Sequence, residues 1–433
     1  MSRESRTVRE PWETWEPQET RWGPLGSLDR LLVTRDHAGA VAYLVDKLAV
    51  AHGRRQRLRH ALARSLDLTG MRRLLTPTAP YGELPARFRT ALYWLNRVFG
   101  PEGEPLLAGP PFDGNRPAGF VLLTDYEGSS RGQAVGFLFA DREETPRAVL
   151  KLRPDGGPSE PPLVKEATAL DELVVLPSSL AATVPRRRAF HRLEGASALL
   201  TSVLPGRSAY VELHRGILSG AEAAARHLEL AGAWLGRFHR ATRQDERWQP
   251  PDPDDPRFGP VRGGDGSAPR WLRELTDDLE TSPLVSCSGH GDFWARNLLV
   301  PPEDSDALPG VVDWGGYQAV AEPYEDLFHF PWTYAGLHPA GRRWSRGVLP
   351  TESDPESAFR RVFLEDNALA RAVRRYFQLY TQGSGLPWSL LPALFRLFLL
   401  TRAAADGEIA GKEGPWLRTY QGFDTAPRSV FSG

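Results

Sequence analysis

Apolar residues recur at three- and four-residue steps between Leu28 and about Leu75, within the first quarter of the chain. This is the period of an amphipathic helix, and a further short helix is predicted from Ala86 to Phe99. The residues before Leu28 show no such period and are expected to form an arm on the surface. A connector rich in proline and glycine, residues 100–117, ends this mostly helical N-terminal extension.

From residue 118 to about residue 205 the pattern changes to that of β-structure. The apolar runs Gly119–Leu123 and Val135–Phe139 flank a Gly/Ser-rich stretch and predict a hairpin. Ala148–Leu152 and Ala198–Val203 predict two further strands, and Leu163–Leu176 has the period of an amphipathic helix. We therefore expect a small sheet with one helix in this region.

The rest of the chain is expected to be mostly helical. An apolar face from Leu228 to Phe238 predicts one helix, and helices are also expected around residues 356–379 and 389–406. The longest apolar run, Trp388–Leu400, contains Arg396 and is shorter than the roughly twenty residues that a membrane helix needs. The fold class that follows is α+β, with no membrane span.

Composition narrows the classes of partner. The 53 basic and 54 acidic residues give a formal net charge of -1, so no bulk field would attract nucleic acid or an anionic membrane. Cys287 is the only cysteine, which excludes a disulfide framework and fits a reducing compartment. The charged N-terminus lacks the apolar core of a signal peptide, so we expect a cytoplasmic protein.

The most informative stretch runs from Leu284 to Leu327. Asp292 lies in a polar break after a short apolar run, and Asn297 follows five residues later. The apolar pair Val311 and Val312 then leads directly to Asp313. A carboxylate able to accept a proton, followed by an amide and an acid able to hold a hard cation through oxygen, is what phosphoryl transfer from a Mg-nucleotide requires.

The order of the features carries more weight than any one of them. The glycine-bearing hairpin tip comes first, then a lysine in a strand, Lys151, and a glutamate in a helix, Glu166. The lysine is informative because the chain otherwise uses arginine, its lysines being Lys47, Lys151, Lys165 and Lys412. A strand end and the Asp292 and Asp313 segments follow. A bilobal kinase uses its parts in this order.

The chain from about residue 118 onward resembles the aminoglycoside phosphotransferase family. That family is the small-molecule branch of the protein-kinase-like fold and includes choline and homoserine kinases. The resemblance lies in HGDFWARNLLV, similar to the family's catalytic loop, in VVDWGG, similar to its metal-binding segment, and in EPYEDLFHF. It implies a bilobal protein-kinase-like fold with a helical extension (residues 1–115), a nucleotide-binding N-lobe (116–204) and a helical C-lobe (205–433).

The resemblance also implies roles for the residues at matching positions. Asp292 would be the catalytic base, and Asn297 and Asp313 would bind Mg²⁺ between the nucleotide phosphates. Lys151 would contact the phosphates and be held by Glu166, with Glu172 as the less favoured alternative. The remaining positions are the hairpin tip that would approach phosphate (Gly128, Ser129, Ser130), the hinge that would present backbone groups to the nucleotide base (Ser202, Leu204) and the residues that would support the loop (His290, Asp326).

Several alternatives stay open. The donor is taken as ATP, with GTP as the alternative, and the acceptor as a hydroxyl of a small molecule, for which a sugar or aminoglycoside-like compound is favoured. Trp294, Arg296 and Gly315–Gly316 depart from the family pattern and leave the acceptor unsettled. A catalytically degenerate kinase-fold binding module and a protein kinase are the competing functions. The N-terminal extension could cover the site, hold a partner or form a homodimer.

Overall fold

The computed structural model describes residues 31–33, 40, 43, 98, 117, 119–124, 133–154, 162–193, 195–215, 220–255, 258, 268, 270–302, 308–337, 359–410, 419, 423 and 429–431. Its contacts divide the chain into two units, residues 1–167 with 186–203 and residues 168–185 with 204–433. Most of the predicted N-terminal extension lies outside the described residues. No helix in the described part combines the length and apolar composition that crossing a bilayer requires.

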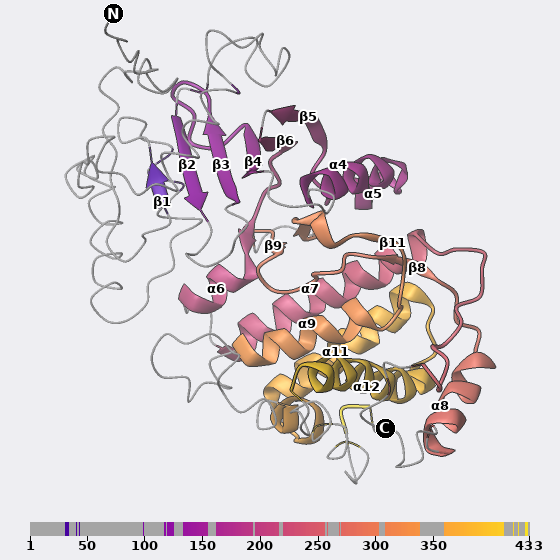
Figure 1. The fold of residues 1–433 in the computed structure, drawn as a ribbon. Helices are drawn as coiled ribbons and strands as arrows, with labels where there is room; N and C mark the ends of the chain where they lie inside the picture. Colours follow the sequence, from indigo (N-terminus) through magenta and orange to yellow (C-terminus); the bar gives the residue numbers. More distant parts are fainter. Residues whose placement is uncertain are drawn as a thin grey trace, which may run out of the picture. The chain divides into compact units, whose positions relative to one another are not determined.

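A six-stranded antiparallel sheet forms most of the described part of the first unit (Figure 1). In spatial order its strands are β1 (Leu31–Val33), β2 (Gly119–Thr124), β3 (Ala134–Phe139), β4 (Ala148–Pro154), β6 (Ala196–Ser202) and β5 (Arg187–Leu193). The hairpin of β2 and β3 confirms the prediction, with Gly119 opposite Phe139. Helix α4 (Pro162–Glu172) follows β4, where the sequence predicted a helix.

The two edge strands of this sheet were not predicted. Leu31 was expected in a helix, and that expectation is wrong, because β1 pairs with β2 with Leu31 opposite Leu123. Strand β5 begins at Arg187 and runs through a charged stretch without an apolar pattern. Charged side chains are common on edge strands because they discourage pairing with another chain. Helical backbone is found at Tyr43, whose ring lies 5.1 Å from that of Phe137.

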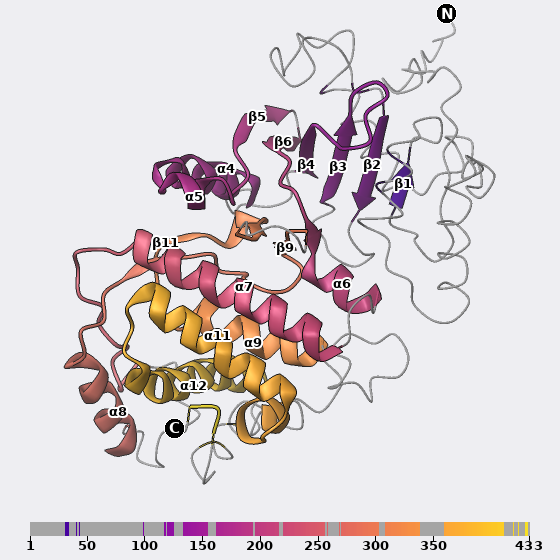
Figure 2. The same ribbon diagram turned by 180° about the vertical axis from the view of Figure 1, so that it is seen from behind.

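The second unit is mainly helical. Both views show α7, α9, α11 and α12 gathered into one bundle (Figures 1 and 2). Its helical elements are η5 (Leu173–Val175), α5 (Ser178–Ala181), α6 (Ala209–Arg215), α7 (Gly220–Ala241), α8 (Arg270–Glu280), η7 (Trp314–Gly316), α9 (Glu325–Leu337), η10 (Arg360–Leu364), α11 (Ala368–Ser384), η11 (Trp388–Leu390) and α12 (Leu391–Ala410). The one long helix predicted over residues 356–379 is broken, because Asn367 caps a new helix by accepting a bond from Ala370 N at 2.9 Å.

Short strands between α8 and α9, together with one that precedes α6, hold the segments that carry the candidate chemistry. Strand β9 (Leu298–Val300) lies between β10 (Gly310–Val311) and β7 (Arg207–Ser208) in one small sheet. Strand β8 (Cys287–Gly289) pairs with β11 (Gln318–Ala321) in another. The loop that follows β8 and the loop that follows β10 are therefore each attached to hydrogen-bonded strands.

The close approach of α7 and α11 makes Gly236 a position where a side chain should destabilise the fold. A Cβ at Gly236 would lie 2.5 Å from the carbonyl oxygen of Tyr380. Alanine gains about 1 kcal/mol of helix propensity over glycine, but overpacking a contact between two backbones costs about 1–3 kcal/mol or more. We expect Gly236→Ala to lower the free energy of unfolding by about 2 kcal/mol, measured by urea denaturation. Glu229→Ala, at an exposed position of the same helix, is the control and should change it by less than about 0.5 kcal/mol. A Gly236→Ala protein as stable as wild type would contradict the packing described here.

Candidate active site

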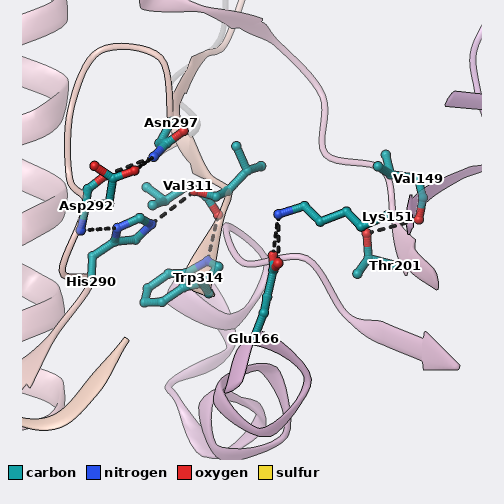
Figure 3. Close-up of polar contacts among 10 residues, drawn as sticks. Val149, Lys151, Glu166, Thr201, His290, Asp292, Asn297, Val311 and Trp314 are labelled. Atoms are coloured by element: carbon teal, nitrogen blue, oxygen red, sulfur yellow. Dashed lines mark hydrogen bonds and ion pairs between the residues drawn. The ribbon is translucent and has the colours of Figure 1, made fainter. Parts of the chain in front are cut away.

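In the first unit, Lys151 and Glu166 form a buried ion pair (Figure 3). Lys151 lies in β4 and Glu166 in α4, and the lysine Nζ is 2.7 Å from both carboxylate oxygens. The two residues are only 8% and 3% exposed. Of the two glutamates considered from the sequence, Glu166 is the one that pairs with Lys151. A buried pair of this kind is weak evidence for stability but fixes the position of the ammonium group.

In the second unit, Asp292 and Asn297 are joined directly. The Asn297 side-chain amide donates to the Asp292 carboxylate at 3.0 Å and to the Asp292 backbone carbonyl at 2.9 Å (Figure 3). Asn297 is buried and Asp292 is partly exposed. Both hydrogen bonds come from the side-chain nitrogen of Asn297, which therefore holds the Asp292 carboxylate in place. The side-chain oxygen of Asn297 takes no part in these bonds.

His290 braces this loop from within. The backbone N–H of Asp292 donates to His290 Nδ1 at 3.2 Å, and His290 Nε2 lies 3.0 Å from the carbonyl oxygen of Val312 (Figure 3). Since Nδ1 accepts, the proton of the neutral ring is assigned to Nε2, which donates to that carbonyl. The ring also packs 4.6 Å from that of Trp314. His290 therefore ties the Asp292 loop to the segment that carries Asp313.

Asp326 holds the same loop from its other side. Located in the first turn of α9 and 4% exposed, it accepts hydrogen bonds from the backbone N–H groups of His290 at 2.5 Å and Gly291 at 3.1 Å. Burial raises its pKa to about 6, although the backbone donors act in the opposite direction. Because the folded-state pKa is raised, its contribution to stability is largest below about pH 4 and is lost as the pH rises through about 6. At neutral pH the fold thus keeps a costly buried carboxylate that positions the loop.

Asp313 occupies an unusual backbone conformation after β10. Its φ and ψ of 70° and 64° lie in the left-handed region, which non-glycine residues seldom adopt. The neighbouring Trp314 is fully buried and donates from its indole to the carbonyl of Val311 at 3.0 Å. Val312 N donates to the Asn297 carbonyl at 3.0 Å. Strained backbone held by surrounding contacts is frequent at functional sites.

The charges of Asp292 and Asp313 affect each other. Burial, and then the charge of Asp313, raise the pKa of Asp292, while polar contacts with Asn297 and Trp294 and the charge of Arg296 lower it. The indole N–H of Trp294 exerts this effect by proximity and forms no hydrogen bond within the described residues. A divalent cation would reduce the repulsion between these two carboxylates, and the amide oxygen of Asn297 could be a further ligand for it.

The oxygen ligands at hand suit Mg²⁺ bound together with a nucleotide. No group of three or more His, Cys, Asp or Glu side chains in the described part of the chain could hold a metal ion alone. Mg²⁺ is usually held by one or two carboxylates together with water and substrate phosphates, not by an all-protein cage. Asp313 and Asn297 fit that incomplete type of ligand set.

The other residues predicted from sequence are placed as follows. Gly128, Ser129 and Ser130 lie outside the described residues. Ser202 ends β6, and its hydroxyl accepts a hydrogen bond from Arg186 N at 2.9 Å. Leu204 is the first residue of the longer of the two segments that make up the second unit.

Sequence reasoning missed the segment that fixes the backbone of the Asp292 loop. Ser208 Oγ donates to the carbonyls of Ala295 at 3.2 Å and Arg296 at 2.9 Å, and Tyr210 N donates to the Ala295 carbonyl at 3.0 Å. These residues precede the loop by more than eighty positions, so no local pattern indicates the contact. The Asp292 loop is thus held by β7 and α6 as well as by Asp326.

Residues 135–349 match the model of the phosphotransferase enzyme family. These residues include β3 from its second residue onward, β4, α4 and every segment of the Asp292 and Asp313 loops. A search of curated proteins gives no match to this chain.

Proposed function

Residues 135–349 belong to the phosphotransferase enzyme family, and from this we propose that the protein is a small-molecule kinase with a bilobal protein-kinase-like fold. It transfers the γ-phosphate of ATP, or of GTP, to a hydroxyl group of a small acceptor. The observation that carries the proposal is the Asp292 carboxylate, held by Asn297 and set close enough to Asp313 for their charges to interact.

In this proposal Asp292 is the general base. Its carboxylate orients the acceptor hydroxyl and takes its proton as the new O–P bond forms. Asn297 keeps the carboxylate in one orientation, and His290 and Asp326 fix the backbone on either side of it. A carboxylate whose pKa is raised is a stronger proton acceptor than that of an ordinary aspartate.

In this proposal the nucleotide that donates the phosphate is bound mainly through electrostatic interactions with its phosphate groups. Asp313 and the Asn297 amide oxygen would hold Mg²⁺, which supplies neutralisation of the phosphate charge when bound. Lys151, fixed by Glu166, contacts the donor phosphates through its ammonium group. Gly128–Ser130, which the sequence predicts to be the hairpin tip, would provide backbone N–H groups for phosphate, and the chain around Ser202 and Leu204 would provide backbone groups for the nucleotide base.

Calorimetric titration of the purified chain with ATP and with GTP, with and without Mg²⁺, tests this proposal. Metal-dependent binding of one nucleotide supports the kinase and names the donor. Absence of binding by both nucleotides would overturn the proposal and favour a degenerate kinase-fold binding module. Phosphate transfer to generic protein substrates, and to no small hydroxyl compound, would favour a protein kinase instead.

Asp313→Ala should weaken Mg-nucleotide binding about ten- to a hundredfold, because it removes the charged ligand of the metal while leaving the nucleotide contacts of Lys151 in place. Binding measured in EDTA should change far less, since the metal is then absent from both proteins. Asp278→Ala, which removes an exposed aspartate from α8, is the matched control and should bind as wild type does. Equal loss of affinity with and without Mg²⁺ would show that Asp313 acts on the fold and not on a metal.

A further inference from the structure

Arg296 presents an exposed cation within the Asp292 loop. Its guanidinium carbon lies 4.9 Å from the centre of the Trp294 ring and 5.0 Å from the centre of the Tyr210 ring. The two rings contact each other at a tilt of 64°, with their centres 6.3 Å apart. Contact with two aromatic faces restricts a long side chain that would otherwise move freely in solvent.

The backbone of Arg296 is fixed as well. Its carbonyl oxygen accepts the hydroxyl proton of Ser208 at 2.9 Å, and the preceding carbonyl accepts from Tyr210 N at 3.0 Å. The same residue, Tyr210, thus contacts both the loop backbone and the guanidinium. Because both ends of the side chain are held, the position of the charge is set before any ligand arrives, which lowers the entropy lost on binding.

The charge of Arg296 is not neutralised by an ion pair with any described carboxylate. Other exposed arginines have such partners: Arg147 with Glu143, Arg270 with Glu274, and Arg371 with Asp366. Aromatic contact engages the face of a guanidinium, while its N–H donors lie at the edge and can bind a carboxylate or phosphate through two parallel bonds. The field of Arg296 reaches Asp292, because it lowers the pKa of that carboxyl group.

We propose that Arg296, held by Trp294 and Tyr210, binds an anionic group of the acceptor and selects a hydroxyl compound that also carries a carboxylate or a phosphate. This inference rests on the proposed function, since it assumes that the acceptor hydroxyl meets Asp292. It narrows the sugar or aminoglycoside-like acceptor expected from the sequence to acidic members such as sugar acids and sugar phosphates. A polycationic aminoglycoside would be repelled by the fixed charge.

The test is a panel of acceptors that differ in charge, assayed by release of nucleoside diphosphate in the presence of Mg²⁺ and the nucleoside triphosphate that binds. Glucose, kanamycin, glucuronate and glucose 6-phosphate serve as the neutral, cationic, carboxylate and phosphate probes. For wild type we expect an anionic probe to have a KM at least about tenfold below that of glucose, or to bind correspondingly tighter in calorimetry when no turnover occurs. The preference should weaken as salt is added.

Variants separate recognition from chemistry. Arg296→Ala should raise KM for the anionic probe about ten- to a hundredfold, with a smaller change in kcat and unchanged affinity for the Mg-nucleotide. Arg296→Lys keeps the positive charge but loses the two parallel N–H donors of the guanidinium, so it should recover only part of the affinity for the anionic probe. Arg273→Ala, an exposed arginine on α8, is the control.

Each contrary outcome is specific. A panel in which no anionic probe reacts or binds better than glucose overturns the inference, and so does an Arg296→Ala protein with the wild-type preference. A variant that loses nucleotide affinity would assign Arg296 to the donor and not to the acceptor. Failure of the proposed function is seen separately, as absence of Mg-nucleotide binding in wild type. Preserved nucleotide binding with no charge preference refutes only the role of Arg296.

Discussion

Asp292→Asn should lower kcat about a thousandfold while leaving the affinity for Mg-nucleotide within about threefold of wild type. General base catalysis typically contributes 10²- to 10⁴-fold, and an amide of the same shape cannot accept the hydroxyl proton. The asparagine oxygen can still accept the hydrogen bond that Asn297 donates at 3.0 Å, so the loop should stay in place. The measurement is single-turnover phosphate transfer, paired with a nucleotide titration.

The pH profile gives a second readout of the same residue. Because burial and the charge of Asp313 raise the pKa of Asp292, its base form is lost at a higher pH than an ordinary aspartate would show. We expect wild-type kcat/KM to rise with pH through that raised pKa and to level off above it, and the residual activity of Asp292→Asn to lack this rise. Asp278→Asn is the control for the loss of one surface carboxylate. An Asp292→Asn enzyme that keeps a tenth of the activity would exclude Asp292 as the base.

The parts of the fold that the sequence predicted are those set by local patterns. Strands β2, β3, β4 and β6 alternate or run apolar, so the local pattern alone contains most of the information needed to predict them. Strand β1 could not be predicted, because its partner β2 lies about ninety residues further along the chain. Strand β1 has only three residues, and they lie in a stretch whose apolar residues follow a helical period, so the local sequence gives too weak a signal for a strand.

The candidate site shows the same division. The order of Lys151, Glu166, Asp292, Asn297 and Asp313 along the chain is a signal that the sequence itself contains, and it predicts phosphoryl transfer. The hydrogen bonds from Ser208 and Tyr210 to the Asp292 loop could not be predicted, since they join backbone groups far apart in the chain. Every residue has the same backbone carbonyl, so the identity of the accepting residue does not reveal such a contact in the sequence.

Two departures from the family pattern gain a physical reason in the structure. Trp294 and Arg296, which left the acceptor unsettled, form one cluster with Tyr210. In the second departure, the pair Gly315–Gly316, Gly316 packs directly on Gly291. The aromatic side chains of Trp314, Phe328, Phe330 and Tyr334 are fully buried and belong to the core of the second unit.

The contact between Gly291 and Gly316 joins the loop of Asp292 to the loop of Asp313. Gly291 has a φ of +77°, and a Cβ there would overlap the carbonyl oxygen of Gly316 and lie 2.7 Å from its carbonyl carbon. A Cβ at Gly316 would in turn lie 3.1 Å from the His290 carbonyl oxygen. Neither loop can therefore gain a side chain at this point without moving away from the other.

Gly291→Ala should consequently cost both stability and activity, and Gly385→Ala separates the two causes. Gly385 ends α11 with a φ of +79°, and a Cβ there meets nothing within 4 Å. Both variants carry the strain of a left-handed alanine, roughly 1–2 kcal/mol, but only Gly291→Ala adds the collision. We expect Gly291→Ala to lose about 2 kcal/mol more in urea denaturation and to lower kcat about a hundredfold, because a shift of about 1 Å in a catalytic group can have that effect. Equal stability losses in the two variants, with kcat retained in both, would show that the loops do not depend on this contact for the geometry of Asp292 and Asp313.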